Sequence, residues 1–248
     1  MPRGGRRERR GTARRVRCGL CVSGFLLACA HDMIDPEITV RPPNPDSSRS
    51  EYPAHWWAPA EDLAWWEIGP QAAGPGEVIL SKRHELGLLS NFARTPFEFH
   101  GVRYESLEGL WQMMLYPEGP GDPRARYPGL VWPHTREEVA RMAGFEAKAA
   151  GDIAFENMRR MGINWVTFEG RRMTYMTTLR GEHYRLIVEA TRAKVLQNPE
   201  VREVLLRTGD LILRPDHTQP AAAPPSWRYF DILMDIREEL RRGVETGE

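Results

Sequence analysis

One stretch of this 248-residue chain, residues 89–112, constrains the fold more than any other. Apolar and polar residues alternate on both sides of the His100-Gly101 pair, and a glycine there can take the positive φ that a tight turn requires. Ser106 follows where its side chain can accept hydrogen bonds from the free N–H groups of a helix start. That helix is predicted to run to about residue 116, with one apolar face formed by Leu107, Leu110, Trp111 and Met114. The first prediction is therefore a β-hairpin that leads directly into an amphipathic helix.

Glu108 lies in the first turn of this predicted helix, beside the apolar face. A carboxylate at that position is stabilised by the positive end of the helix dipole, by about 0.3–1 kcal/mol. A purely structural role is therefore one interpretation of Glu108, and a functional carboxylate is the other. The pattern of residues alone leaves both interpretations open.

The rest of the chain predicts an α+β protein: a mainly helical single domain with a small antiparallel sheet. A strand is predicted over residues 77–81, and residues 117–133, with five prolines, predict a surface loop. Thr135 and Glu138 fit a capping box at the start of a helix. Further amphipathic patterns complete a set of predicted helices over residues 135–151, 153–161, 182–197, 199–208 and 229–241. A chain that is 41% hydrophobic can bury one sizeable core in this way.

The N-terminal part has a different composition from the rest, which divides the chain into residues 1–32, 33–76 and 77–242. Residues 1–17 carry eight arginines and one acid, and an apolar run ending at Cys29 resembles a secretory signal with a lipoprotein cleavage box. In the alternative interpretation Met33 is the true start, and the protein is cytoplasmic rather than exported and anchored through Cys29. All three cysteines lie before residue 30, so thiol chemistry is excluded from the remainder.

Residues 33–76 predict an arm rich in proline and small residues, interrupted by two tryptophan pairs, Trp56-Trp57 and Trp65-Trp66. Four indoles carry too much apolar surface to remain in water. They are expected either to clamp the arm across the domain or to form a lid that stacks on a purine or pyrimidine ring.

Several motifs resemble those of the NADAR domain family, the YbiA-like N-glycosidases of riboflavin-biosynthesis intermediates. The resemblance begins with Ser90-Asn91-Phe92, Pro96-Phe97, Gly101, Tyr104, Ser106, Glu108 and Gln112. It continues with Ala147-Lys148-Ala149-Ala150-Gly151, Asn164-Trp165, Ala193-Lys194 and Asn198, and ends with residues 205–210 and 232–237. It covers roughly residues 80–240.

This resemblance implies an enzyme that cleaves the bond between a ribose and a nitrogen base, without cofactor or metal. The implied substrate is a small nucleotide-like riboflavin-pathway intermediate or an ADP-ribosylated guanine in nucleic acid; no membrane partner is expected unless residues 1–32 are a real lipoprotein signal. Such bonds break through a cationic sugar, which carboxylates can stabilise. The implied catalytic residues are Glu108, as water-orienting or charge-stabilising group, and Asp216 as its partner. The implied substrate-binding residues are Asn91, Phe92, Gln112, Lys148 and Trp165.

The chain also departs from the family pattern. Leu115 stands where the family's helix has a lysine, residues 171–183 look like an insertion, and most of a glycine-rich loop is missing from residues 211–230. The alternative function is therefore a catalytically impaired module that binds ADP-ribose or a related nucleotide. Three of the site residues also have structural interpretations: Asp216 as a solvated turn acid, Lys148 as a helix-end charge and Trp165 as a core residue.

Overall fold

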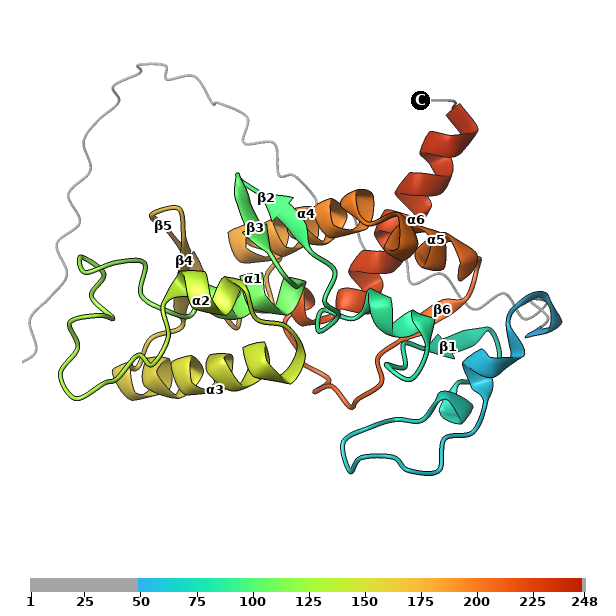
Figure 1. The fold of residues 1–248 in the computed structure, drawn as a ribbon, viewed down its shortest axis with the longest axis horizontal. Coiled ribbons are helices and arrows are strands. Elements are labelled where there is room, and N and C mark those ends of the chain that lie inside the picture. The colour runs from blue at the N-terminus through green and yellow to red at the C-terminus, as the bar shows by residue number, and fades with distance from the viewer. Residues whose placement is uncertain (1–48, 247–248) are drawn as a thin grey trace, which may run out of the picture. The chain divides into compact units, whose positions relative to one another are not determined.

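The predicted hairpin and helix at residues 97–113 are present in the computed structural model, which describes residues 49–246 (Figure 1). Strand β2 (Phe97–Phe99) pairs antiparallel with β3 (Val102–Tyr104) across a turn in which His100 and Gly101 both have positive φ. Helix α1 (Leu107–Met113) follows, and the hydroxyl of Ser106 accepts a 2.9 Å hydrogen bond from the Gly109 amide. The predicted cap is confirmed, whereas α1 ends a few residues earlier than expected.

The described residues contain five more α-helices and four more strands, together with five short 3-10 helices. The helices are α2 (Arg136–Ala140), α3 (Gly144–Met161), α4 (Glu182–Gln197), α5 (Pro199–Arg207) and α6 (Tyr229–Thr246). The strands are β1 (Glu77–Ile79), β4 (Trp165–Phe168), β5 (Arg171–Thr174) and β6 (Ile212–Arg214). Residues 49–246 belong to one compact unit, so the predicted α+β class with a mainly helical domain is confirmed. The predictions for residues 1–48, including Met33 and Cys29, lie outside the described residues.

The strands of the described residues do not form one continuous sheet; they form three sheets of two strands each. The β2–β3 and β4–β5 pairs are antiparallel, as expected of a small antiparallel sheet. The β1–β6 pair is parallel and joins residues from opposite ends of the domain, which the sequence pattern did not indicate. Part of the expected insertion, residues 171–174, is strand β5.

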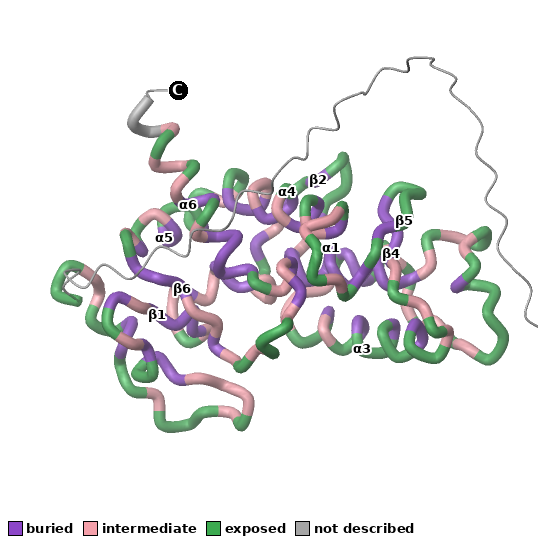
Figure 2. The backbone as a smooth tube through the Cα atoms, turned by 180° about the vertical axis from the view of Figure 1, so that it is seen from behind, coloured by how far each residue is buried: buried purple, intermediate pink, exposed green. Residues whose placement is uncertain are grey.

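Helix α1 is buried along its whole length, and α2, α3 and α4 all pack against it (Figures 1 and 2). The predicted apolar face of α1 is confirmed: its four residues are all nearly inaccessible to solvent. Six further core residues, Val139, Ala154, Ile187, Val195, Leu205 and Leu233, connect the other helices to the same cluster. Any polar side chain on α1 is therefore held in a fixed, largely dry environment.

The prediction of one helix over residues 135–151 was wrong, although its capping box at Thr135 is present. Helix α2 ends at Ala140 and α3 begins at Gly144, a residue with positive φ, then continues past residue 151 to Met161. The break is stabilised by tertiary hydrogen bonds: the Glu105 amide donates to the Ala140 carbonyl, and the Ser106 hydroxyl donates to the Met142 carbonyl. These bonds satisfy carbonyl groups that a continuing helix would otherwise use.

None of the helices within residues 49–246 is long and apolar enough to cross a bilayer.

The approach of α1 to the break between α2 and α3 requires a glycine at position 109. A Cβ atom there would lie 2.7 Å from the Met142 carbonyl oxygen and 3.0 Å from that of Val139, and both are backbone atoms that cannot move aside alone. We therefore predict that Gly109→Ala lowers the free energy of unfolding by about 1–3 kcal/mol, measured by urea denaturation. Gly119→Ala is the matched control, because nothing lies within 4 Å of its Cβ position. Equal stability of the two variants would contradict the prediction.

Candidate functional site

Glu108 projects from the first turn of α1 into the interior and is only 6% exposed. Its backbone amide donates a 2.9 Å hydrogen bond to the Asn91 carbonyl, so the loop at residues 88–92 is tied to the start of the helix. Its side-chain oxygen Oε1 accepts a 2.6 Å hydrogen bond from Nε2 of Gln112, one turn further along. The structure thus brings together three of the residues singled out by the sequence.

The position of the Gln112 amide depends on Gly151 in the middle of α3. A Cβ atom on Gly151 would lie 1.8 Å from Oε1 of Gln112, so the amide occupies the space that any other residue would fill. This explains why a glycine, expected to end a helix, lies inside α3 instead. The contact fixes the Gln112 side chain between α1 and α3, with its donor group turned to Glu108.

Burial raises the pKa of Glu108 from 4.5 to about 7. The hydrogen bond from Gln112 and the positive charges of Lys148 and Lys82 lower this pKa, and the nearby Asp152 raises it, but burial is the largest cause. Near neutral pH this carboxyl can therefore hold a proton or release it, unlike an ordinary surface glutamate.

Asp216 is fully buried just after β6, where the sequence alone suggested an open loop. It forms an ion pair with Lys82, and Nδ1 of His217 lies 3.0 Å from its other oxygen. Burial raises the pKa of Asp216, but the hydrogen bonds with His217 and Lys82 outweigh this effect, so the pKa lies below its ordinary value. Glu108 and Asp216 are thus two buried carboxyls whose pKa values are shifted in opposite directions.

Lys82 is a candidate functional residue that the sequence reasoning missed. Its ammonium nitrogen lies 5.4 Å from the ring centre of Trp66 and 5.3 Å from that of Phe92, in addition to its ion pair with Asp216. No local pattern marks Lys82, because its partners lie far from it in the sequence. Cation–π contacts of this kind favour a fixed position for the amine.

Phe92, Phe145 and Lys82 line an open hollow of about 550 Å³, which we call the aromatic hollow. The rings of Phe92 and Phe145 meet edge to face, with their centres 5.2 Å apart, and Trp66 packs against Phe145 in the same way. The hollow is further lined by polar and apolar residues that include His84, Leu88 and Arg94. Its volume is in the range of small-molecule sites. Glu108 does not line this hollow, although Lys82 acts on its charge.

The two tryptophan pairs of the predicted arm have different environments. Trp56 and Trp57 are buried and donate hydrogen bonds to Glu85 and to the Glu77 carbonyl, as a clamp would. Trp66 lies beside the aromatic hollow, whereas Trp65 is 97% exposed. The clamp and the lid were offered as alternatives, and the first pair has the position of a clamp.

Lys148 lies in the second turn of α3 and forms an ion pair with Asp152 one turn away. It was expected near the end of a helix, which the structure corrects, because α3 continues well beyond it. Its charge acts on Glu108, so it belongs to the same neighbourhood. A role in binding phosphate stays a prediction.

Trp165 lies elsewhere, in the wall of a second hollow of about 310 Å³ that shares no lining residue with the aromatic hollow. Two guanidinium groups contact its ring: their central carbons lie 3.9 Å (Arg172) and 4.8 Å (Arg124) from the ring centre. The structure therefore does not bring Trp165 together with Phe92, and its predicted stacking role remains untested.

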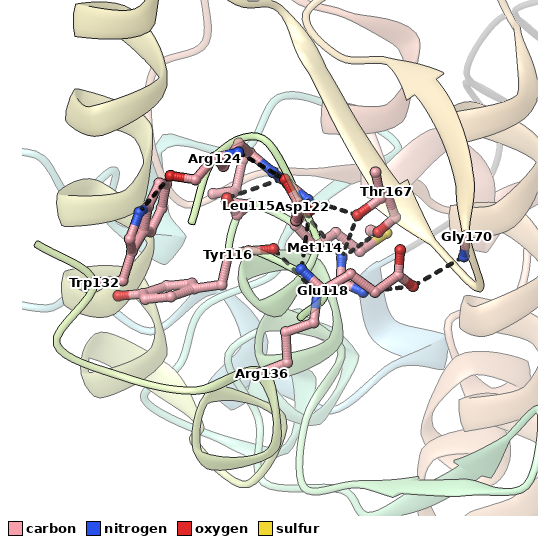
Figure 3. Close-up of polar contacts among 10 residues, drawn as sticks. All are labelled: Met114, Leu115, Tyr116, Glu118, Asp122, Arg124, Trp132, Arg136, Thr167 and Gly170. Carbon is pink, nitrogen blue, oxygen red and sulfur yellow. Dashed lines mark hydrogen bonds and ion pairs between the residues drawn. The ribbon is translucent and has the colours of Figure 1, made fainter. Parts of the chain in front are cut away.

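Near the second hollow, two arginines donate hydrogen bonds to carbonyl groups of the segment that directly follows α1 (Figure 3). Arg124 donates to the carbonyl oxygens of Met114 and Leu115, and Arg136 donates to that of Tyr116. Arg124 also forms an ion pair with Asp122, so residues of the predicted surface loop fix the chain just after α1. The side chain of Leu115 is buried in the core.

No group of three His, Cys, Asp or Glu side chains within residues 49–246 is arranged to hold a metal ion.

Comparisons with known proteins give one structural likeness. No family model matches the chain, and no curated protein matches it. The NMR structure of the E. coli protein YbiA is similar, with 21% sequence identity over 68% of this chain and 88% of that one, and a TM-score of 0.40.

The raised pKa of Glu108 predicts a specific pH dependence of stability. Because the folded state holds the proton more tightly than the unfolded state, stability falls as pH rises from about 4.5 to about 7. Glu108→Gln removes this loss. From pH 5 to pH 8 the free energy of unfolding of the variant, relative to that of the wild type, should therefore rise by on the order of 3 kcal/mol. Urea denaturation at both pH values measures the difference.

The matched control is Glu203→Gln on the exposed face of α5. Its stability relative to the wild type should be the same at both pH values. If Glu108→Gln behaved like this control, the Glu108 carboxyl would titrate normally and the assignment of a buried, protonatable group would fail.

Proposed function

We propose that this protein is an N-glycosidase that hydrolyses the ribose–nitrogen bond of a ribosylated base. The proposal rests on the two buried carboxyls, Glu108 and Asp216, whose pKa values are shifted in opposite directions around a lysine at the aromatic hollow. Cleavage through a cationic sugar requires two acids with different pKa values, because one group must hold a proton and the other a negative charge.

In this mechanism Asp216 is the ionised group. Its carboxylate stabilises positive charge at the anomeric carbon as the bond to the base breaks, while Lys82 and His217 keep it deprotonated. Glu108, with a pKa of about 7, donates its proton to the departing nitrogen. Water then adds its oxygen to the anomeric carbon and returns a proton to Glu108. This differs from the sequence interpretation, in which Glu108 was the water-orienting or charge-stabilising group and Asp216 its partner.

The aromatic hollow would hold the substrate. The rings of Phe92, Phe145 and Trp66 offer faces and edges for a base. Asn91 and Gln112 would contact the ribose or base, and Lys148 would contact a phosphate. The substrate would be a riboflavin-pathway intermediate or an ADP-ribosylated guanine, free or within nucleic acid, which agrees with a cytoplasmic protein.

The second candidate function is a module that binds ADP-ribose or a related nucleotide without hydrolysing it. Two observations favour it: Glu108 does not line the aromatic hollow, and Leu115 is buried where the resembled family has a lysine. Asp216 does not line the hollow either, so for catalysis the substrate, or the loop carrying Asn91, would have to bring the sugar to both carboxyls.

The test is to incubate the full chain with a ribosylaminopyrimidine and with ADP-ribosylated guanosine, and to detect the free base by mass spectrometry. We expect release from one of them. Glu108→Gln and Asp216→Asn should each reduce the rate at least about 100-fold, the usual contribution of an acid–base group and of a charge-stabilising group, while calorimetry still detects substrate binding.

Glu203→Gln is again the control and should keep the wild-type rate. Binding without release by the wild-type protein would favour the second candidate. If the wild-type protein neither bound nor cleaved either compound, both candidate functions would be contradicted.

A further inference from the structure

Lys194 in α4 is a buried cation, and the proposed mechanism gives it no role. The residue is 1% exposed, and its ammonium group donates hydrogen bonds to the carbonyl oxygens of Leu88 at 2.9 Å and Ser90 at 2.8 Å. Within residues 49–246 no carboxylate forms an ion pair with it. Burial lowers its pKa to about 7.

A lysine in this environment is costly, because a buried ammonium without a carboxylate loses its hydration. An apolar side chain such as methionine has similar length and would fill the same space without that loss. The two carbonyl contacts are therefore the feature that an apolar residue could not replace. Both carbonyls belong to one segment, residues 88–92, which we call the corner.

The corner connects three parts of the site. The Asn91 carbonyl accepts the hydrogen bond from the Glu108 amide, and the Phe92 carbonyl accepts one of 3.0 Å from the Gly144 amide at the start of α3. Leu88 and Phe92 both line the aromatic hollow. The position of the corner thus sets the distance between the hollow and Glu108.

We propose that Lys194 is a positioning residue that fixes the corner, and so aligns Phe92 in the aromatic hollow with Glu108 on α1. Its relation to catalysis rests on the proposed function, but the geometric claim does not. Without the two hydrogen bonds the backbone of the corner would be bonded to other helices only through α1 and α3, and residues 90–92 would open locally more often than the rest of the domain.

Native-state hydrogen exchange of the full chain, followed by NMR, tests this claim. In Lys194→Met the amides of Glu108 and Gly144, which donate to the corner, should exchange at least tenfold faster than in the wild type. The Ile212 amide, which donates to the Gly76 carbonyl beside the β1–β6 pair, is the internal reference and should change less than threefold.

Arg237→Met is the matched control variant. Arg237 is also buried and donates hydrogen bonds to a side-chain and a backbone oxygen, but these belong to Thr208 and Leu211, just after α5. This variant should accelerate exchange of the Leu211 amide and leave the Glu108 amide within threefold of the wild type.

A second substitution covers the case in which Lys194→Met does not fold. Lys194→Gln keeps one polar donor group, so the Glu108 and Gly144 amides should exchange faster than Ile212 by a smaller factor. Equal acceleration at all three amides, or none at Glu108 and Gly144, would overturn the proposal in either variant. Because exchange does not require turnover, this result is independent of whether the protein hydrolyses any N-glycoside.

Discussion

The hydrogen bond between the Glu108 amide and the Asn91 carbonyl is the contact on which the candidate site depends. It joins a helix that is buried on all sides to a loop that lines an open hollow. Helix α1 cannot shift, because α2, α3 and α4 pack around it, so the bond transfers that rigidity to the corner. Lys194 donates to the same loop from α4 and the Gly144 amide from the start of α3, so three helices form hydrogen bonds with the corner.

The buried charges around this contact are compensated in different ways. Asp216 has a lysine and a histidine as partners and stays ionised, whereas Glu108 has only an amide as hydrogen-bond partner and tends toward its neutral form. Lys194 has only carbonyl dipoles. Burial disfavours every charge, and the number and kind of partners decide how far each pKa moves. Opposite shifts of two carboxyls are therefore a consequence of packing, not of residue type.

Several elements that depend on interactions between residues close in the sequence were predicted correctly. The turn at Gly101, the Ser106 cap and the Thr135 capping box each depend on residues within a few positions of one another. The β4–β5 hairpin also turns at a residue followed by a glycine, Glu169-Gly170, so the sequence offers a signal from which this hairpin could have been predicted. In the structure both residues have positive φ. The break between α2 and α3 could not, because hydrogen bonds from α1 produce it.

The sequence by itself determined one hairpin, the start of every α-helix of the described residues except α3, and the one-turn spacing that brings Gln112 beside Glu108, since these features follow from short-range periodicity and capping. Asn91 was selected only through the family resemblance, and its contact with Glu108 is a tertiary one. Only the tertiary structure decided which charges are buried and what they meet. Lys82 finds Asp216 across 134 residues, and Lys194 finds the Ser90 carbonyl across 104. Contacts at such separations leave no periodic trace in the chain, because they are set by how whole helices pack.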